Sequence, residues 1–232
     1  MITTIFFDLF FTLTVPVYDE KLNEYSILNL TTEEWEFYAE NDSLYNERAL
    51  GKLTDENEII KRIVEKIPFE ITVKQQRDLL KARKCRMKNA LNNVSSEIIN
   101  TLKIIKQNNF KLGLISNADR IDCKYWLDST LATYFDDAVF SCNVGMMKPD
   151  HRIYNLAMNR LGAAPENCLF VGDGGSDELL GAKESGMKTV FTEFFDKKKN
   201  DSRDRIIKYA DYQIQHFNQI WDILKSRESG TM

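Results

Sequence analysis

The chain has 232 residues, 43% of them hydrophobic, which suffices for one large domain or for a domain with a smaller inserted lobe. Its net charge of −4 comes from 35 acidic and 31 basic residues that are mixed along the sequence. This balance disfavours nucleic acid or an anionic membrane as a partner, so we expect a protein that acts on a small molecule.

The cysteines and the N-terminus indicate a cytoplasmic protein. The four cysteines include no CxxC pair, and the two histidines cannot complete a common zinc site with them, so we expect reduced thiols. The sequence lacks the basic start and apolar stretch of a signal peptide and any long uncharged apolar window, which predicts neither export by that route nor a membrane span. Monomer and homodimer both remain open.

Short apolar runs predict five buried strands, at residues 4–7, 111–116, 138–141, 168–171 and 188–192. Amphipathic helical patterns at 95–109 and 151–162 lie between strands. Continuous apolar strands that alternate with such helices indicate a parallel sheet covered on both faces. The predicted fold class is therefore α/β, with a doubly wound parallel sheet.

Residues 16–91 interrupt this alternation, because they carry helical patterns at 31–42, 53–67 and 73–91. We expect an all-helical cap domain of residues 16–91, inserted into a core domain of residues 1–15 and 92–232. Open parallel sheets bind ligands at the carboxyl ends of their strands, so this lobe would cover the site as a lid. Two basic stretches, 81–88 and 196–200, are interpreted as a solvated helix face and a solvated loop.

Polar side chains that could carry chemistry fall at four predicted strand ends. They are Asp8, the pair Ser116 and Asn117, Lys148, and the two carboxylates Asp173 and Asp177. Each alone is an ordinary turn, cap or solvated residue. Together they match the requirements of one reaction, the attack of a carboxylate on a phosphoryl group. Both groups are negatively charged, so the reaction requires a cation between them and hydrogen-bond donors around the phosphoryl oxygens.

The three carboxylates Asp8, Asp173 and Asp177 are hard oxygen ligands suited to Mg²⁺. Lys148 and the Ser116 hydroxyl would face the phosphate from the same edge of the sheet. With a phosphate dianion present, three carboxylates far outweigh the positive charge of Lys148, so the site would require the metal to hold its substrate.

Four motifs occur in order over residues 5–190: FFDLFFTLT, LISNAD, GMMKPDHRIY and VGDGGSDELLGAKESGM. They resemble the pattern of the haloacid dehalogenase-like (HAD) hydrolase superfamily, which has a nucleophilic Asp with a downstream Thr-Leu, a Ser/Thr-Asn strand end, a Lys-Pro and a Gly-Asp-x-x-x-Asp turn. The resemblance implies a Rossmann-like core with a helical cap between the first two motifs.

By this resemblance Asp8 is the nucleophile and a magnesium ligand, and it forms an aspartyl-phosphate intermediate. Asp173 would be a direct metal ligand, Asp177 a direct or water-mediated one, and the backbone carbonyl of Phe10 the remaining protein ligand. The resemblance thus implies a hydrolase of small phosphorylated metabolites.

The same resemblance implies that Ser116, the Asn117 backbone and Lys148 bind the phosphate, and that Lys148 is also a catalytic residue. In the cap, residues 45–57 resemble the family's specificity segment, and Arg48 could face the pocket and hold a substrate anion.

The sequence departs from the family's phosphatases directly after the nucleophile. Phe10 replaces the second Asp, which acts as general acid and base, and Phe11 replaces the usual Gly. Such proton transfer typically contributes about 10²–10⁴ in rate, so we expect slow turnover of ordinary alkyl phosphates.

Three hypotheses remain. The leading one is a magnesium-dependent phosphohydrolase with weak or unusual chemistry. The second is cleavage of another bond: the family's 2-haloacid dehalogenases also lack the acid, and its phosphonate-cleaving members use a cap lysine, for which Lys52 is a candidate. The third is a protein that binds metal and phosphate without turnover.

Overall fold

The computed structural model describes residues 1–226 and contains one six-stranded parallel sheet in the order β3-β2-β1-β4-β5-β6. The strands are β1 (Thr4–Phe7), β2 (Lys111–Ser116), β3 (Asp137–Phe140), β4 (Cys168–Gly172), β5 (Lys188–Thr192) and β6 (Tyr212–Ile214). The predicted doubly wound α/β sheet is confirmed. Five of the strands match the apolar runs to within one residue at either end, whereas β6 was not predicted because it has three residues and pairs only with β5.

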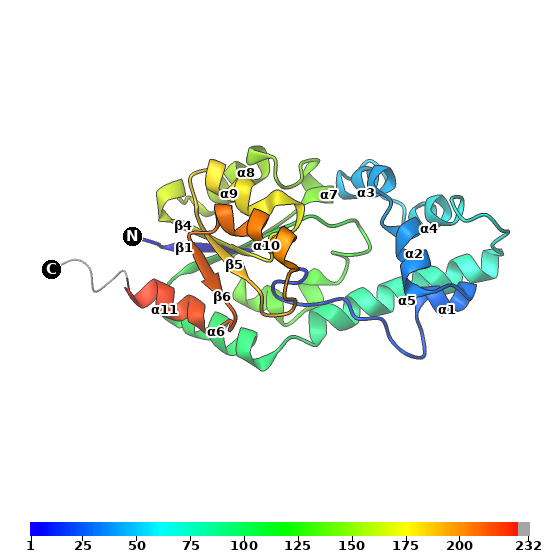
Figure 1. Ribbon diagram of the computed structural model, residues 1–232, viewed down its shortest axis with the longest axis horizontal. Coiled ribbons are helices and arrows are strands. Elements are labelled where there is room, and N and C mark those ends of the chain that lie inside the picture. Colours follow the sequence, from blue (N-terminus) through cyan, green and yellow to red (C-terminus); the bar gives the residue numbers. More distant parts are fainter. Residues whose placement is uncertain (227–232) are drawn as a thin grey trace.

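Helices cover both faces of the sheet (Figure 1). Helices α6 (Ser96–Gln107) and α11 (Gln219–Ser226) lie on one face, and α8 (His151–Leu161) and α9 (Glu178–Glu184) lie on the other. Successive side chains of a strand point to opposite faces, so Ile5 and Phe7 join the first layer and Phe6 the second. These fully buried strands explain why the apolar runs are continuous rather than alternating.

Five helices between β1 and β2 form a separate helical unit. They are α1 (Glu24–Leu28), α2 (Thr32–Ala39), α3 (Asp42–Ala49), α4 (Glu56–Val64) and α5 (Val73–Asn92). Their apolar side chains form a core of their own around Trp35, Ile63 and Leu79. Figure 1 shows this unit at one end of the molecule, with α5 running from it towards the sheet.

Capping explains where the helices α2 and α5 begin. The side chains of Thr31 and Thr72 each accept a hydrogen bond from the backbone N–H three residues on. Their own backbone N–H groups donate to the side chains of Glu34 and Gln75, which completes a capping box at each helix start. Four short helices were not predicted, because none combines a capping box with a long apolar stripe. They are α1, α3, α7 (Ser141–Val144) and α10 (Asn200–Ile206).

The remaining elements are 3₁₀ turns at Trp126–Asp128, Leu131–Tyr134, Pro165–Asn167, Gly175–Asp177 and Ile207–Tyr209. Across the 226 described residues, every helix is too short or too polar to span a bilayer.

The interpretation of residues 81–88 as a solvated face is wrong for two arginines. Arg83 is 1% exposed and Arg86 is 7% exposed, as deeply buried as the apolar Met87 beside them. Helix α5 is covered on more than one side, because it packs on α1 and α4 and also against the core segment that follows β2. Arg83 and Arg86 therefore lie inside the molecule and are paired there, whereas Lys81 and Lys88 are exposed.

Candidate active site

The topology of the sheet places a crevice at the carboxyl end of β1. This strand lies between β2 and β4, so the chain leaves it towards one edge of the sheet and later returns to the other edge. Ligands of open α/β sheets bind at such a switch point. Asp8 directly follows β1, Asp173 directly follows β4, and Ser116 is the last residue of β2.

Asp8 and Lys148 form the centre of the site. The Asp8 side chain is buried, and the Lys148 ammonium lies 2.5 Å from Asp8 Oδ1 and 2.5 Å from Glu178 Oε2. A backbone hydrogen bond of 3.0 Å from Asp8 to the Val171 carbonyl holds the acid against β4. The structure therefore brings Asp8 and Lys148 together, as the sequence predicted, and it adds Glu178, which was not predicted.

Burial dominates the electrostatics of these groups. Loss of solvation raises the pKa of Asp8 above its usual 3.8, although Lys148 acts in the opposite direction. Burial likewise raises the pKa of Glu178 to about 8, again against the effect of Lys148. For Lys148, burial alone would lower the pKa, but the two carboxylates outweigh it and the pKa is raised. The lysine therefore stays charged between two acids.

Three buried carboxyl groups converge at this point. Asp8, Asp173 and Glu178 each offer an oxygen within 4.8 Å of the others'. Asp173 accepts a hydrogen bond from the Gly175 backbone at 3.1 Å, and its other oxygen lies 2.7 Å from the ammonium of Lys198. The interpretation of residues 196–200 as a solvated loop is therefore wrong for Lys198, which reaches into the site.

Glu178, rather than Asp177, completes the acidic cluster. Ser176 and Asp177 have φ values of 52° and 49°, so two consecutive residues adopt the left-handed conformation and redirect the chain before α9. Asp177 is exposed, whereas Glu178 is 1% exposed and accepts a hydrogen bond of 3.0 Å from the Gly174 backbone. A Cβ at Gly172 would lie 2.1 Å from Glu178 Oε1, so a larger residue here would displace the Glu178 carboxyl group.

The Asn117 side chain has a role that the motif alone did not reveal. Its amide nitrogen donates to the Lys148 carbonyl at 3.1 Å, and its oxygen accepts from the Lys148 backbone at 2.8 Å. Both bonds fasten the lysine's backbone to the end of β2. Ser116 beside it is fully buried at the same strand end.

A cavity of about 500 Å³ opens above these groups and is shared by the core and the helical unit. Core residues that line it include Asp8, Lys148, Asp173 and Glu178, and the helical unit contributes Glu36, Glu40, Tyr45, Arg83 and Arg86. Phe10 and Phe11 form part of its wall. This volume is within the usual range for sites of small ligands.

Arg48 does not line this cavity, contrary to the expectation that it holds a substrate anion. Its side chain is fully buried, 3.1 Å from Glu40 and 3.5 Å from Asp119, a core residue that follows β2. Its charge thus joins the helical unit to the core. Arg83, which pairs with Asp119 as well, is the cationic residue of this cluster that reaches the cavity.

The two phenylalanines differ in their surroundings. Phe10 packs on the first apolar layer, so its ring is half-buried. Phe11 is 43% exposed and has a φ of 61°, the left-handed region that glycine adopts without strain. Lys52 is exposed and does not line the cavity, so the structure lends no support to an imine-forming role.

The donor set fits a hard divalent cation. Three carboxylates, directly after β1 and β4 and at the start of α9, converge with oxygens close to one another, and oxygen ligands are what Mg²⁺ prefers. Two ammonium groups, those of Lys148 and Lys198, contact the cluster and leave its charge negative when all three acids are ionised. A metal would therefore be attracted to this position.

Comparison with known proteins agrees with this geometry. A family model described as haloacid dehalogenase-like hydrolase matches residues 2–186. A glyceraldehyde 3-phosphate phosphatase of Pyrococcus furiosus is 31% identical over 134 residues, which is 56% of this chain and 54% of that protein. The chain therefore matches only about half the length of that curated relative.

Two solved structures share the fold over most of both chains. A 2-haloacid dehalogenase from Pseudomonas syringae has a TM-score of 0.66 and 21% identity, with 98% of this chain and all of that chain covered. A HAD family enzyme of Bacteroides thetaiotaomicron in complex with magnesium and inorganic phosphate has a TM-score of 0.65 and 17% identity, with 85% and 97% covered. The extent of the family match and the strand-end acids together show that this chain belongs to the haloacid dehalogenase-like hydrolases.

Proposed function

We propose that this hydrolase is a magnesium-dependent phosphohydrolase that acts on a small phosphorylated metabolite through an aspartyl-phosphate intermediate on Asp8. One observation carries the proposal: the buried Asp8 carboxylate lies at the end of the central strand, beside the Lys148 ammonium and two further buried carboxyl groups. A nucleophile, a cation and a metal-binding donor set thus share one wall of a cavity of small-ligand size.

Asp8, Asp173 and Glu178, with the backbone carbonyl of Phe10, would hold the magnesium ion. Glu178 takes the place first assigned to Asp177, because the Asp177 side chain is exposed. A bound magnesium ion offsets the negative charge of a phosphoryl group and so permits attack by an anionic nucleophile. The Bacteroides structure contains magnesium and inorganic phosphate, which supports a metal and a phosphoryl group as ligands of this site.

The reaction would proceed in two displacements. A carboxylate oxygen of Asp8 attacks phosphorus, the ester P–O bond breaks, and the leaving alkoxide takes a proton. Water then attacks the phosphorus of the aspartyl phosphate, which releases inorganic phosphate and restores the carboxylate. Lys148, the Ser116 hydroxyl and the Asn117 backbone N–H would stabilise the phosphoryl oxygens throughout.

Phe10 determines which substrates can react quickly. Because a phenyl ring cannot donate a proton, the leaving group must depart as an anion or receive its proton from elsewhere. We therefore propose that turnover depends steeply on the acidity of the leaving group. Residues 16–91 would act as the cap that closes over the substrate, and the triose phosphate named for the Pyrococcus relative indicates its approximate size.

The alternatives have less support from the site. Dehalogenation requires no metal, yet three carboxyl groups are buried together here. Phosphonate cleavage requires a lysine above the cavity, and Lys52 does not line it. A protein that binds phosphate without turnover remains as an outcome of the test below.

The test compares wild type with Asp8→Asn, Phe10→Asp and the matched control Phe10→Asn, with and without magnesium. The substrates are a series of aryl and alkyl phosphates of graded leaving-group acidity, together with a 2-haloacid. We expect wild-type turnover to require magnesium, to be fastest with aryl phosphates and to vanish in Asp8→Asn.

Phe10→Asp should accelerate alkyl phosphates by about 10²-fold or more and aryl phosphates much less, because only poor leaving groups need the proton. Phe10→Asn, which has the same shape but no acid, should not. Turnover of the 2-haloacid in the presence of chelator would overturn the proposal in favour of dehalogenation. An inert wild type combined with an active Phe10→Asp would show a phosphate-binding protein instead.

A further inference from the structure

Two of the four cysteines lie side by side, away from the cavity above Asp8. The sulfur atoms of Cys123 and Cys142 are 3.7 Å apart, and both thiols are free. Cys123 is half-buried, whereas Cys142 is 6% exposed. Cys168 donates to a backbone carbonyl and Cys85 lies on α5, so neither belongs to this pair.

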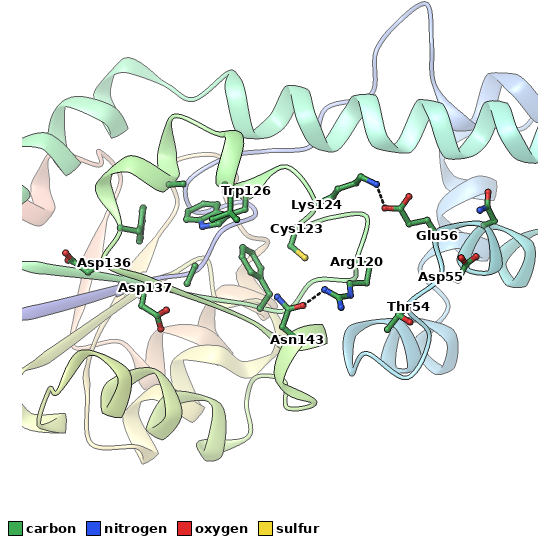
Figure 2. A pocket seen from close by; sticks show the side chains of 16 residues that line it. Thr54, Asp55, Glu56, Arg120, Cys123, Lys124, Trp126, Asp136, Asp137 and Asn143 are labelled. Carbon is green, nitrogen blue, oxygen red and sulfur yellow. Dashed lines mark hydrogen bonds and ion pairs between the residues drawn. The ribbon is translucent and has the colours of Figure 1, made fainter.

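Cys123 lines a second cleft, of about 770 Å³, between the core and the loop that precedes α4 (Figure 2). Figure 2 shows its sulfur among the lining side chains, which include Arg120, Trp126 and Asn143. A soluble oxidant of small size could therefore reach this thiol without entering the active site or unfolding the protein.

Tertiary contacts hold the two cysteine segments together. Cys123 follows β2 and Cys142 lies in α7 after β3, two neighbouring strands. The Ser141 hydroxyl accepts a hydrogen bond from the Ala118 backbone at 3.0 Å, and the Arg120 guanidinium donates to the Asn143 side chain at 2.7 Å. The thiols therefore sit opposite each other as part of the native fold.

We propose that Cys123 and Cys142 are a redox-active pair that forms an intramolecular disulfide on exposure to a hydroperoxide. A disulfide has an S–S length of about 2 Å, so the sulfurs need to approach each other by roughly 1.7 Å. Side-chain torsions supply movements of this size, and the backbone bonds on either side of the pair stay in place.

The chemistry balances with the hydroperoxide as the sole oxidant. One thiolate attacks an oxygen of the peroxide, the O–O bond breaks, and the alcohol or water leaves with a sulfenic acid formed on sulfur. The second sulfur then attacks the sulfenic sulfur, the S–O bond breaks, and water leaves. Two thiols are oxidised by two electrons, and one peroxide is reduced.

Access and charge divide the roles of the two thiols. Cys123 lines the cleft, so it is the thiol that meets the oxidant and forms the sulfenic acid. Cys142 lies behind it and resolves the sulfenic acid. Its contact with Cys123 and the charge of Arg120 lower the pKa of Cys142 below its usual 9.0, although burial opposes both, and the lowered pKa favours the attacking thiolate. Redox-sensitive pairs likewise place an accessible cysteine next to a resolving one.

The disulfide would join two parts of the core surface on which the helical unit rests. The residue after Cys123, Lys124, pairs with Glu56 of α4 at 2.6 Å. On the other side, a Cβ at Gly51 would lie 2.1 Å from the Cys142 carbonyl oxygen, so the helical unit packs closely on α7. Oxidation would thus link the two contact segments through a covalent bond.

The test exposes the full-length wild-type protein to hydrogen peroxide in slight excess, blocks the remaining thiols with an alkylating agent and determines the intact mass. We expect a species that has lost two hydrogen atoms and retains two alkylated cysteines, Cys85 and Cys168. Proteolysis without reductant should yield a linked peptide that contains Cys123 and Cys142, and a dithiol reductant should restore four alkylated sites.

Two single variants, Cys123→Ser and Cys142→Ser, are matched controls that remove one sulfur each, and a Cys85→Ser/Cys168→Ser double variant retains only the pair. The double variant should lose both hydrogens as wild type does, whereas neither single variant should form the linked peptide. The proposal is overturned if wild type keeps four alkylatable thiols, gains only oxygen atoms, or forms disulfides between molecules.

Discussion

Arg83 offers the sharpest test of how the helical unit is held to the core. Its guanidinium is buried, 3.1 Å from Asp119 and 2.9 Å from Asp122, and both carboxylates are buried as well. Arg48 provides a second cation near Asp119 at 3.5 Å, and the partly exposed Glu40 adds a third acid. Without Arg83, two buried carboxylates would share one arginine.

Replacement of Arg83 by Met, which has a similar length and no charge, should therefore lower the free energy of unfolding by about 3–5 kcal/mol, the usual cost of one uncompensated buried charge. The effect depends on pH. Arg83 is the strongest of the charges that lower the pKa of Asp122 against burial, so its loss raises that pKa. The deficit should shrink as the pH falls towards 4, because protonation of the acid then relieves the unpaired charge.

Urea unfolding at pH 5 and pH 7, followed by circular dichroism, measures this effect. Lys81→Met is the matched control, because Lys81 lies on the same helix and is exposed. A double variant Arg83→Met/Asp122→Asn removes one unpaired charge and should recover at least about 1 kcal/mol. A loss below about 1 kcal/mol in Arg83→Met, or no recovery in the double variant, would refute the reasoning that this arginine neutralises buried acids.

Three further changes have defined outcomes. In the metal-free protein, the free energy of unfolding should fall by up to ~1.4 kcal/mol per pH unit as the pH rises from about 5 to 8. The reason is that Glu178 keeps its proton to about pH 8 in the folded protein but loses it near 4.5 in the unfolded chain. Urea unfolding of Glu178→Gln over this pH range should show a shallower slope, and a slope equal to that of wild type would contradict the prediction. Lys198→Met should raise magnesium affinity several-fold by calorimetry, because its ammonium contacts a proposed metal ligand, whereas the exposed Lys197→Met should leave affinity unchanged. Gly51→Ala places a Cβ against a core carbonyl at a φ of 68°. It should lower the free energy of unfolding by well over the ~1 kcal/mol expected for Gly162→Ala, whose similar φ of 60° comes with open space around the position. Equal losses in the two variants would argue against close packing at Gly51.

Most of the fold could be predicted from the sequence, because its signals are local. Apolar runs predicted five of the six strands, since a strand buried on both faces must be apolar along its length. Helices α2, α4 and α5 could be predicted from their capping signals and apolar stripes. The strand β6 and the short helices lacked such signals. Pairing with β5 stabilises β6, and packing on neighbouring elements stabilises the short helices.

The site could be predicted in part. The sequence order of its motifs indicated Asp8, Lys148 and Asp173, which the structure places together. It did not distinguish Asp177 from its neighbour, because the choice depends on two left-handed residues in the turn. One signal could have shown the ambiguity: an acid follows Asp177 directly, so either residue could have faced the strand ends.

The sequence by itself determined the strands of the sheet, the family motifs and the phenylalanine at position 10 on which the proposed loss of a general acid rests, because each of these is encoded in adjacent residues. Only the tertiary structure decided which charged side chains pair with each other. Arg48 pairs with Asp119 instead of lining the cavity, and Lys198 contacts the acidic cluster. These partners are far apart in the chain, and a buried charge takes whichever counter-charge the packing places beside it, which no local pattern records.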